Sequence, residues 1–179
     1  MAVNRVSSLG IAVAYALLLT GSSVFAQPQE KPNPLAPPKG NVLLFELRAE
    51  GFQVYEGKPK AGDSAAFEWV LKAPDAILYD ERGDKAGTHG AGPNWLANDG
   101  SKIVAAKSAS APAPGRNAVP WLLLQVKSHE GKGVFSKVTY IQRVDTWAGL
   151  PSVAAAKENA GKELRVRYQA TYRFFGPTP

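Results

Sequence analysis

Apolar and polar residues alternate along most of the chain beyond residue 40. The pattern is clearest in 164–174, where every second residue is Leu, Val, Tyr, Ala, Tyr or Phe and Arg165, Arg167 and Arg173 fall between them. Such alternation places one set of side chains on a buried face of a β-strand and the other in solvent. Eleven residues at about 3.3 Å each extend roughly 35 Å, so we expect a bend or bulge in this strand.

Similar alternation in 43–47 and 67–71 predicts further strands. The run 119–127 is typical of a strand covered on both faces, and the turn 130–133 after it predicts a hairpin with 134–145.

Two segments lack this pattern. Residues 105–118, rich in Ala, Ser and Pro, predict a loop, and 152–162 predict at most one short helix. Many short strands separated by turns, without long amphipathic helices, predict an all-β protein, an antiparallel sandwich or barrel.

The first 26 residues have the features of a secretory signal peptide. Arg5 precedes an apolar run over 9–19, and the small residues of Val24-Phe25-Ala26 predict cleavage before Gln27. The protein is therefore expected to be exported, to the periplasm or the medium, with no transmembrane segment after cleavage. Five prolines in 27–40 predict an extended linker, and 41–179 are expected to form a single β domain.

Composition changes this picture in two ways. The chain has no cysteine, so disulfides and a lipid anchor on cysteine are excluded. The net charge of +6 becomes +5 without Arg5, with 20 basic against 15 acidic residues, which favours anionic polysaccharides or other envelope components as partners. No nucleic-acid-binding motif is present, and no nucleophile motif supports an enzyme.

The densest polar cluster lies in the glycine-rich segment 87–102. His89 has few apolar neighbours there, so it could bind a ligand, transfer protons, ligate a metal or serve a structural role. Asp99-Gly100 is also the preferred centre of a type I′ hairpin turn. A metal site would need His89, His129 and carboxylates such as Asp99 or Glu130, and their spacing does not bring them together. We therefore predict no metal and no cofactor.

Three motifs resemble those of a known family. They are GTHGAGPNW followed by ANDGSK in 87–102, PWLLL in 120–124 and VTYIQRV in 138–144. They are similar to a secreted family known as domain of unknown function 3455, and the similarity covers roughly 41–175. The resemblance implies no activity. It directs attention to the His89 segment and to the pair Gln142-Arg143.

Three functions are consistent with these observations. The first is a non-enzymatic binding module for an anionic or carbohydrate envelope component, with these ligand-binding residues: His89, Asn94, Trp95, Asp99, Lys102, Gln142 and Arg143. The second is a small metal-dependent hydrolytic or redox enzyme that uses His89 and Asp99. The third is an envelope structural or adhesion protein whose Arg165, Arg167 and Arg173 form a basic face. Trp95 and Trp147 lie at segment ends, where a ring can stack on a sugar or join the core.

Overall fold

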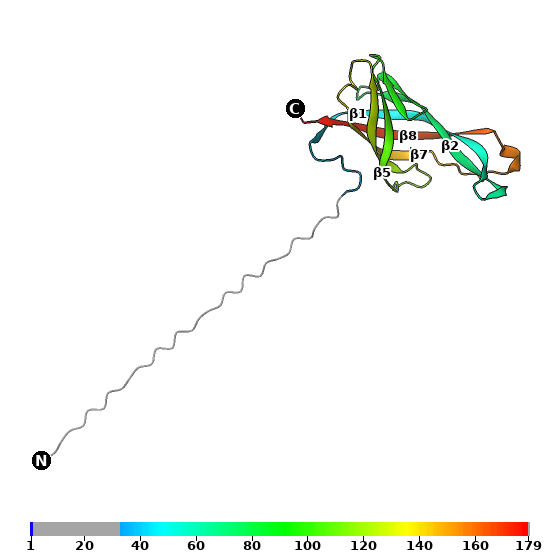
Figure 1. The fold of residues 1–179 in the computed structure, drawn as a ribbon, viewed down its shortest axis with the longest axis horizontal. Helices are drawn as coiled ribbons and strands as arrows, with labels where there is room; N and C mark the ends of the chain where they lie inside the picture. The colour runs from blue at the N-terminus through cyan, green and yellow to red at the C-terminus, as the bar shows by residue number, and fades with distance from the viewer. Residues whose placement is uncertain (2–32, 179) are drawn as a thin grey trace. The chain divides into compact units, whose positions relative to one another are not determined.

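Eight antiparallel strands form a closed barrel in the computed structural model, which describes residue 1 and residues 33–178 (Figure 1). Each strand pairs with the next along the chain, and the last pairs with the first. This confirms the all-β prediction and selects the barrel; the helical content of the described residues is one 3-10 turn, η1. The elements are β1 Asn41–Lys60, β2 Asp63–Tyr79, β3 Lys85–Gly90, β4 Asn94–Ala97, β5 Lys102–Ala111, β6 Trp121–Glu130, β7 Tyr140–Ala148, η1 Lys157–Asn159 and β8 Glu163–Pro177.

Strand β8 follows the alternation in its sequence. Tyr168, Ala170, Tyr172 and Phe174 point inward and are at most 2% exposed, whereas Arg165 and Arg167 lie on the outer face. The irregularity expected of so long a strand occurs in its partners. The register shifts between Leu43 and Phe45 on β1 and between Val144 and Trp147 on β7.

One end of the barrel carries the β2–β3, β4–β5 and β6–β7 connections. The predicted β6–β7 hairpin is present, but the expectation of a strand over 134–145 is wrong in its first part, because β7 begins at Tyr140. Residues 131–139 instead form a loop whose Phe135 and Val138 are fully buried. Phe135 packs on Phe174 with ring centroids 5.1 Å apart. The apolar residues of this loop therefore fill one end of the barrel.

Two other local expectations are corrected. Residues 105–111, expected to be a loop, belong to β5 and pair with β6. Backbone hydrogen bonds to a neighbour hold this Ala- and Ser-rich strand, whose small side chains give little hydropathy contrast. The turn between β4 and β5 is not type I′: Gly100 has φ +84°, but Asp99 does not share a positive φ, which type I′ requires at both central residues.

Unequal strand lengths shape the other end. β2 pairs with β3 only from Ala76 to Tyr79, and β4 pairs with β5 only up to Val104. The tip of the short β3–β4 hairpin, 91–93, therefore stops short of the far parts of β2 and β5. Figure 1 shows β1, β2 and β8 continuing past the other strands of the barrel. This leaves a gap in hydrogen bonding between β2 and β5 at the side of the barrel.

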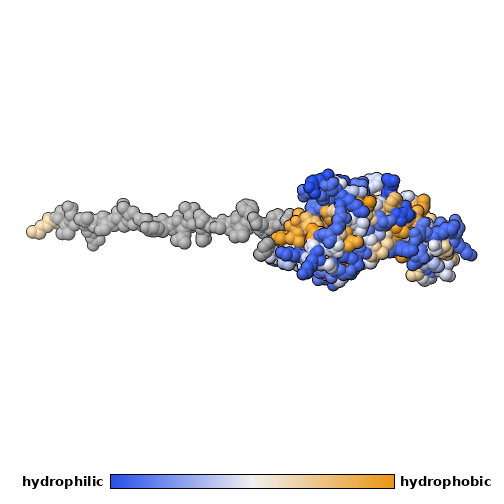
Figure 2. Space-filling model, turned by 90° about the horizontal axis from the view of Figure 1, so that it is seen from above, coloured by the Kyte–Doolittle hydropathy of each residue, from blue (hydrophilic) through white to orange (hydrophobic). Residues whose placement is uncertain are grey.

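The predicted signal peptide and the linker up to residue 32 lie outside the described residues, apart from residue 1. In the described part of the proline-rich segment, Leu35 is buried and its carbonyl accepts a hydrogen bond from the Gln142 side chain. No helix in 33–178 is long and apolar enough to cross a membrane. The face of the domain shown in Figure 2 is largely hydrophilic, with apolar side chains in separate patches between the polar ones.

Candidate functional site

A cavity of about 210 Å³ lies beyond the tip of the β3–β4 hairpin and reaches into the barrel. Its mouth is formed by exposed or half-exposed residues of β2, the hairpin tip and β5, and its inner wall by buried residues and the half-buried Leu122. The mouth residues are Leu71, Lys72, Ala73, Pro74, Gly92, Pro93 and Lys107; farther in lie Gln53, His89, Trp95, Leu122, Leu124, Arg143 and Tyr172. Among the described residues, the lining contains Lys72, Lys107 and Arg143 and no carboxylate.

His89 points into the barrel from β3. Its ring stacks on Trp95, with centroids 4.2 Å apart and planes 16° apart, and meets the edge of Tyr172 at 5.0 Å. Burial lowers its pKa to about 3, although the hydrogen bond to the Asn94 carbonyl opposes this shift; the positive charge of Arg143 lowers the pKa further. The imidazole is therefore neutral near pH 7.

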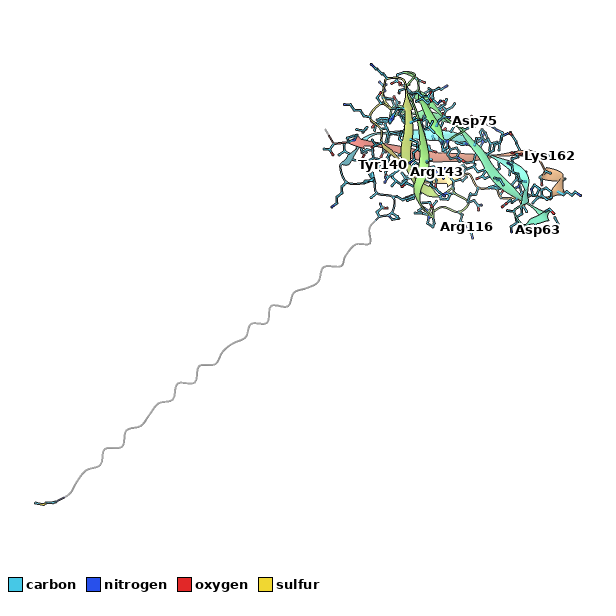
Figure 3. The ribbon with its side chains drawn as sticks, in the orientation of Figure 1. Asp63, Asp75, Arg116, Tyr140, Arg143 and Lys162 are labelled. Atoms are coloured by element: carbon cyan, nitrogen blue, oxygen red, sulfur yellow. The ribbon has the colours of Figure 1, made fainter. Side chains whose placement is uncertain are left out.

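Arg143 also lies inside the barrel. It pairs across the sheet with inward-facing Tyr172 and is 9% exposed; Figure 3 shows it over the middle of the barrel. Its Nε and Nη2 donate to the Pro120 carbonyl at 3.1 and 2.9 Å. Among the residues that the structure describes, no carboxylate lies within ion-pair distance of it. A buried charge without a counter-ion is costly, so this guanidinium is suited to an anion in the cavity.

Several other inner polar atoms have no hydrogen-bond partner in the described part of the chain. Three of them belong to residues that line the cavity: Gln53 Nε2, Trp95 Nε1 and the Tyr172 hydroxyl. Burial raises the pKa of Tyr172 and the charge of Arg143 opposes this rise, yet no hydrogen bond of ordinary geometry joins the two groups. Buried polar groups are normally paired, so these three groups in the cavity wall are exceptions. Three further unpaired atoms, on Trp69, Trp121 and Tyr168, belong to residues outside the wall.

Asp99 and Lys102 lie at the other end of the barrel. Asp99 accepts hydrogen bonds from the Ser101 amide at 2.9 Å, the Ser101 hydroxyl at 2.6 Å and the Val134 amide at 2.7 Å. These bonds, with the Ser101 hydroxyl first, lower the pKa of its carboxyl. Lys102 pairs with Glu130 at 3.1 Å. Asp99 thus joins the β4–β5 turn to the loop 131–139 and does not meet His89.

The remaining predicted residues have local roles. The Asn94 side-chain amide donates a hydrogen bond to the Ala91 carbonyl. The backbone carbonyl of Asn94 is hydrogen-bonded to Nδ1 of His89. Gln142 is buried beneath Leu35, whose carbonyl it contacts. The structure therefore brings together His89, Trp95 and Arg143, with the Asn94 backbone beside them, and places Asp99, Lys102 and Gln142 elsewhere.

The alternative metal site is not assembled. Cross-strand pairing runs His89, Trp95, Ile103, His129, so three strand spacings of about 4.8 Å, roughly 14 Å along the wall, separate the two histidines. His129 Nε2 instead contacts the Val138 carbonyl at 2.8 Å. Within 33–178 no group of three His, Cys, Asp or Glu residues could hold a metal ion.

The predicted basic face of β8 is largely paired with acids. Arg165 binds Asp75 at 2.7 Å and Arg173 binds Glu46 at 2.6 Å. Trp95 is fully buried and therefore joins the core. Trp147 lies on the outer surface and is 61% exposed, so its ring does not join the core.

Sequence reasoning missed Gln53 and the mouth lysines, Lys72 and Lys107. Gln53 lies beside a register shift between Val54 and Tyr55, and the consecutive residues 53–55 are all buried. Gln53 keeps the inward phase of Leu47 and Ala49, in unbroken register with β8. Its apolar neighbours Phe52 and Val54 favour the opposite phase, so hydropathy alternation does not indicate its inward direction.

A family model described as "Protein of unknown function (DUF3455)" matches residues 37–176. No curated protein and no solved structure matches the chain. The match covers most of the chain, including every residue of the cavity wall, and agrees with the resemblance of the three sequence motifs. The chain therefore belongs to the DUF3455 family.

Proposed function

We propose that this protein is a non-enzymatic binding module that holds a small organic anion in the barrel cavity. The observation that supports this most is Arg143, a buried guanidinium that lines a cavity without any carboxylate in its walls. Barrels of eight strands are wide enough to hold one small ligand. An anion at Arg143 would supply the counter-ion that the described residues do not.

The cavity walls also limit the size and character of the ligand. Leu71, Leu122 and Leu124 provide apolar surface, and Lys72 and Lys107 extend the positive charge to the mouth. An engineered cavity of about 150 Å³ holds benzene, and this one measures about 210 Å³. The cavity suits a carboxylate slightly larger than benzene. Such a ligand refines the anionic envelope component expected from the sequence, and the predicted signal peptide would place its binding outside the cytoplasm.

Binding explains this arrangement better than catalysis or adhesion does. A histidine with a pKa of about 3 is a poor proton acceptor near neutral pH. Asp99, its partner in the enzyme hypothesis, is engaged at the other end of the barrel. Adhesion through the basic face is weakened because Arg165 and Arg173 already have acidic partners.

The test is calorimetric titration of wild type, Arg143→Met and Arg173→Gln with benzoate and with uncharged benzamide. We expect wild type to prefer benzoate. Arg143→Met should lose on the order of 100-fold in benzoate affinity, because a charge-assisted hydrogen bond is lost. Arg173→Gln, which removes an exposed arginine, should bind as wild type does. No benzoate binding to wild type at millimolar concentration, or equal binding by a folded Arg143→Met variant, would overturn the proposal.

A further inference from the structure

The hydrogen bond between His89 and Asn94 determines which ring nitrogen carries the proton. Nδ1 lies 2.7 Å from the Asn94 carbonyl oxygen, which can only accept a hydrogen bond. Nδ1 must therefore carry the proton in the neutral ring, and Nε2 is left as an acceptor with a free lone pair.

Nε2 has room for a partner. Among the described residues, the hydrogen bond to Asn94 is the only one that the His89 ring makes, so Nε2 has no partner. Unlike the buried unpaired atoms of Gln53, Trp95 and Tyr172, Nε2 is not completely enclosed. The ring lines the cavity, and its two faces are covered in part by Trp95 and Tyr172. A ligand in the cavity would therefore lie against a ring whose Nε2 has no partner among the described residues.

The polar nitrogen atoms of the residues near His89 are hydrogen-bond donors, whereas Nε2 of His89 is an acceptor. Arg143 and Trp95 Nε1 can only donate hydrogen bonds, and the Gln53 amide nitrogen is also a donor. These three residues line the same cavity as His89, together with the Tyr172 hydroxyl. A carboxylate satisfies donors but offers nothing to a free lone pair. A ligand complementary to the whole wall needs a donor of its own.

We infer that the ligand is a hydroxy acid: an anion for Arg143 whose apolar body also carries a hydroxyl that donates to Nε2 of His89. The inference rests on the proposed function and specifies its ligand class. The ring contacts of His89, Trp95 and Tyr172, together with the leucines of the wall, favour an aromatic body. A benzoate with one hydroxyl substituent represents this class.

The test compares benzoate, the three hydroxybenzoates and the three methoxybenzoates by calorimetry on the full domain. At least one hydroxybenzoate should bind wild type about 10-fold more tightly than benzoate, which is the usual gain from one good hydrogen bond. The matching methoxybenzoate should show no gain, because it has no donor. His89→Phe keeps a ring against Trp95 and should bind benzoate and that hydroxybenzoate equally.

A second measurement does not depend on a folded variant. Nitrogen-15 NMR of wild-type histidine should show a neutral His89 ring protonated on Nδ1, and the hydroxybenzoate should shift the Nε2 signal without protonating it. A ring protonated on Nε2, or an imidazolium on binding, would overturn the inference. The inference would also be overturned if wild type bound benzoate and every hydroxybenzoate with equal affinity while Arg143→Met still weakened the binding of benzoate. If Arg143→Met has no effect, or no anion binds, the proposed function itself fails.

Discussion

Arginines on the inner and the outer face of the barrel wall lie in opposite surroundings. On the outside, Arg165 and Arg173 each contact a carboxylate, while their side chains remain 46% and 39% exposed. On the inside, Arg143 is buried and has a backbone carbonyl as its partner. Exposed ion pairs form easily on a charged surface and contribute little stability. A buried guanidinium without an acid needs another explanation, and a bound anion provides one.

The same contrast holds for uncharged and acidic groups. Asp99, at the end of the barrel, uses both carboxylate oxygens in three hydrogen bonds. The Tyr172 hydroxyl, in the interior, makes no hydrogen bond of ordinary geometry within the described residues, although Tyr168 and Arg143 lie near it. Asp99 therefore joins parts of the fold, whereas Tyr172, like Gln53 and Trp95 in the cavity wall, leaves a buried polar atom unpaired among the described residues. Four measurements test this contrast.

The largest effect is expected from His89 when the pH falls. Its folded pKa of about 3 lies below the ordinary histidine value of 6.5, so the unfolded chain binds more protons between these values. The His89 contribution is thus intact above about pH 6.5 and is lost as the pH falls toward 3. At pH 5 the free energy of unfolding should be about 2 kcal/mol lower than at pH 7. Urea titrations of wild type and His89→Gln measure this.

His89→Gln should show most of this pH dependence removed, whereas Arg173→Gln should retain it. The carboxyl of Asp99 has a pKa lowered from 3.8, so it stays ionised throughout this range. Equal pH dependence in wild type and His89→Gln would show that the interior histidine is not held neutral.

A loss of about 1–2 kcal/mol is expected for Asp99→Ala, because the turn and the loop lose the hydrogen bonds that join them. Gly133→Ala should act similarly, since a Cβ there would lie 2.2 Å from Asp99 Oδ2. Urea unfolding measures the loss, and benzoate calorimetry should show unchanged affinity in both variants. A large loss of affinity at full stability would instead return Asp99 to the binding site.

Tyr172→Phe should change the free energy of unfolding of the unliganded protein by less than about 1 kcal/mol, in the stabilising direction. The buried hydroxyl has no partner in the described residues, so its removal relieves a desolvation cost. Thermal and urea unfolding test this. Tyr168→Phe is a matched variant, because the hydroxyl that it removes also has no partner in the described residues. Clear destabilisation would reveal that the hydroxyl is already engaged.

The smallest effect is expected for Arg173→Gln, a loss of no more than about 0.5 kcal/mol that disappears in high salt. Urea unfolding at low and high salt measures it against wild type. A loss of several kcal/mol that persists in salt would mean that the outer pairs are as important as the inner groups, which would remove the contrast.

Much of the fold follows from the sequence because barrel strands with one buried face alternate in hydropathy. The region 164–174 shows this, and β8 has the predicted faces. Strand β5 could not be found in the same way, since Ala and Ser differ little between faces. Only 134–139 differ from the expected strand, because Phe135 and Val138 have strand-like hydropathy although they fill the end of the barrel.

The site was only partly predictable for a related reason. His89, Trp95 and Arg143 were indicated by motifs, but motif membership does not give side-chain direction. All of 141–144 is buried, so burial does not distinguish inward Arg143 from Gln142, which lies beneath Leu35. Gln53 is a polar residue on the inward face of β1, and its apolar neighbours Phe52 and Val54 favour the opposite phase, so hydropathy does not indicate it.

The pairing of the first strand with the last also affects how the protein folds. Asn41 lies opposite Pro177, a separation of 136 residues, and the Thr178 amide donates to the Gly40 carbonyl at 2.9 Å. Contacts so distant in sequence are entropically costly to form and make folding slow. Every strand from β1 to β8 contributes residues to the cavity wall. The cavity therefore exists only when β1 and β8 are paired. A ligand that binds there would therefore stabilise the closed barrel selectively, and bound ligand would slow its opening.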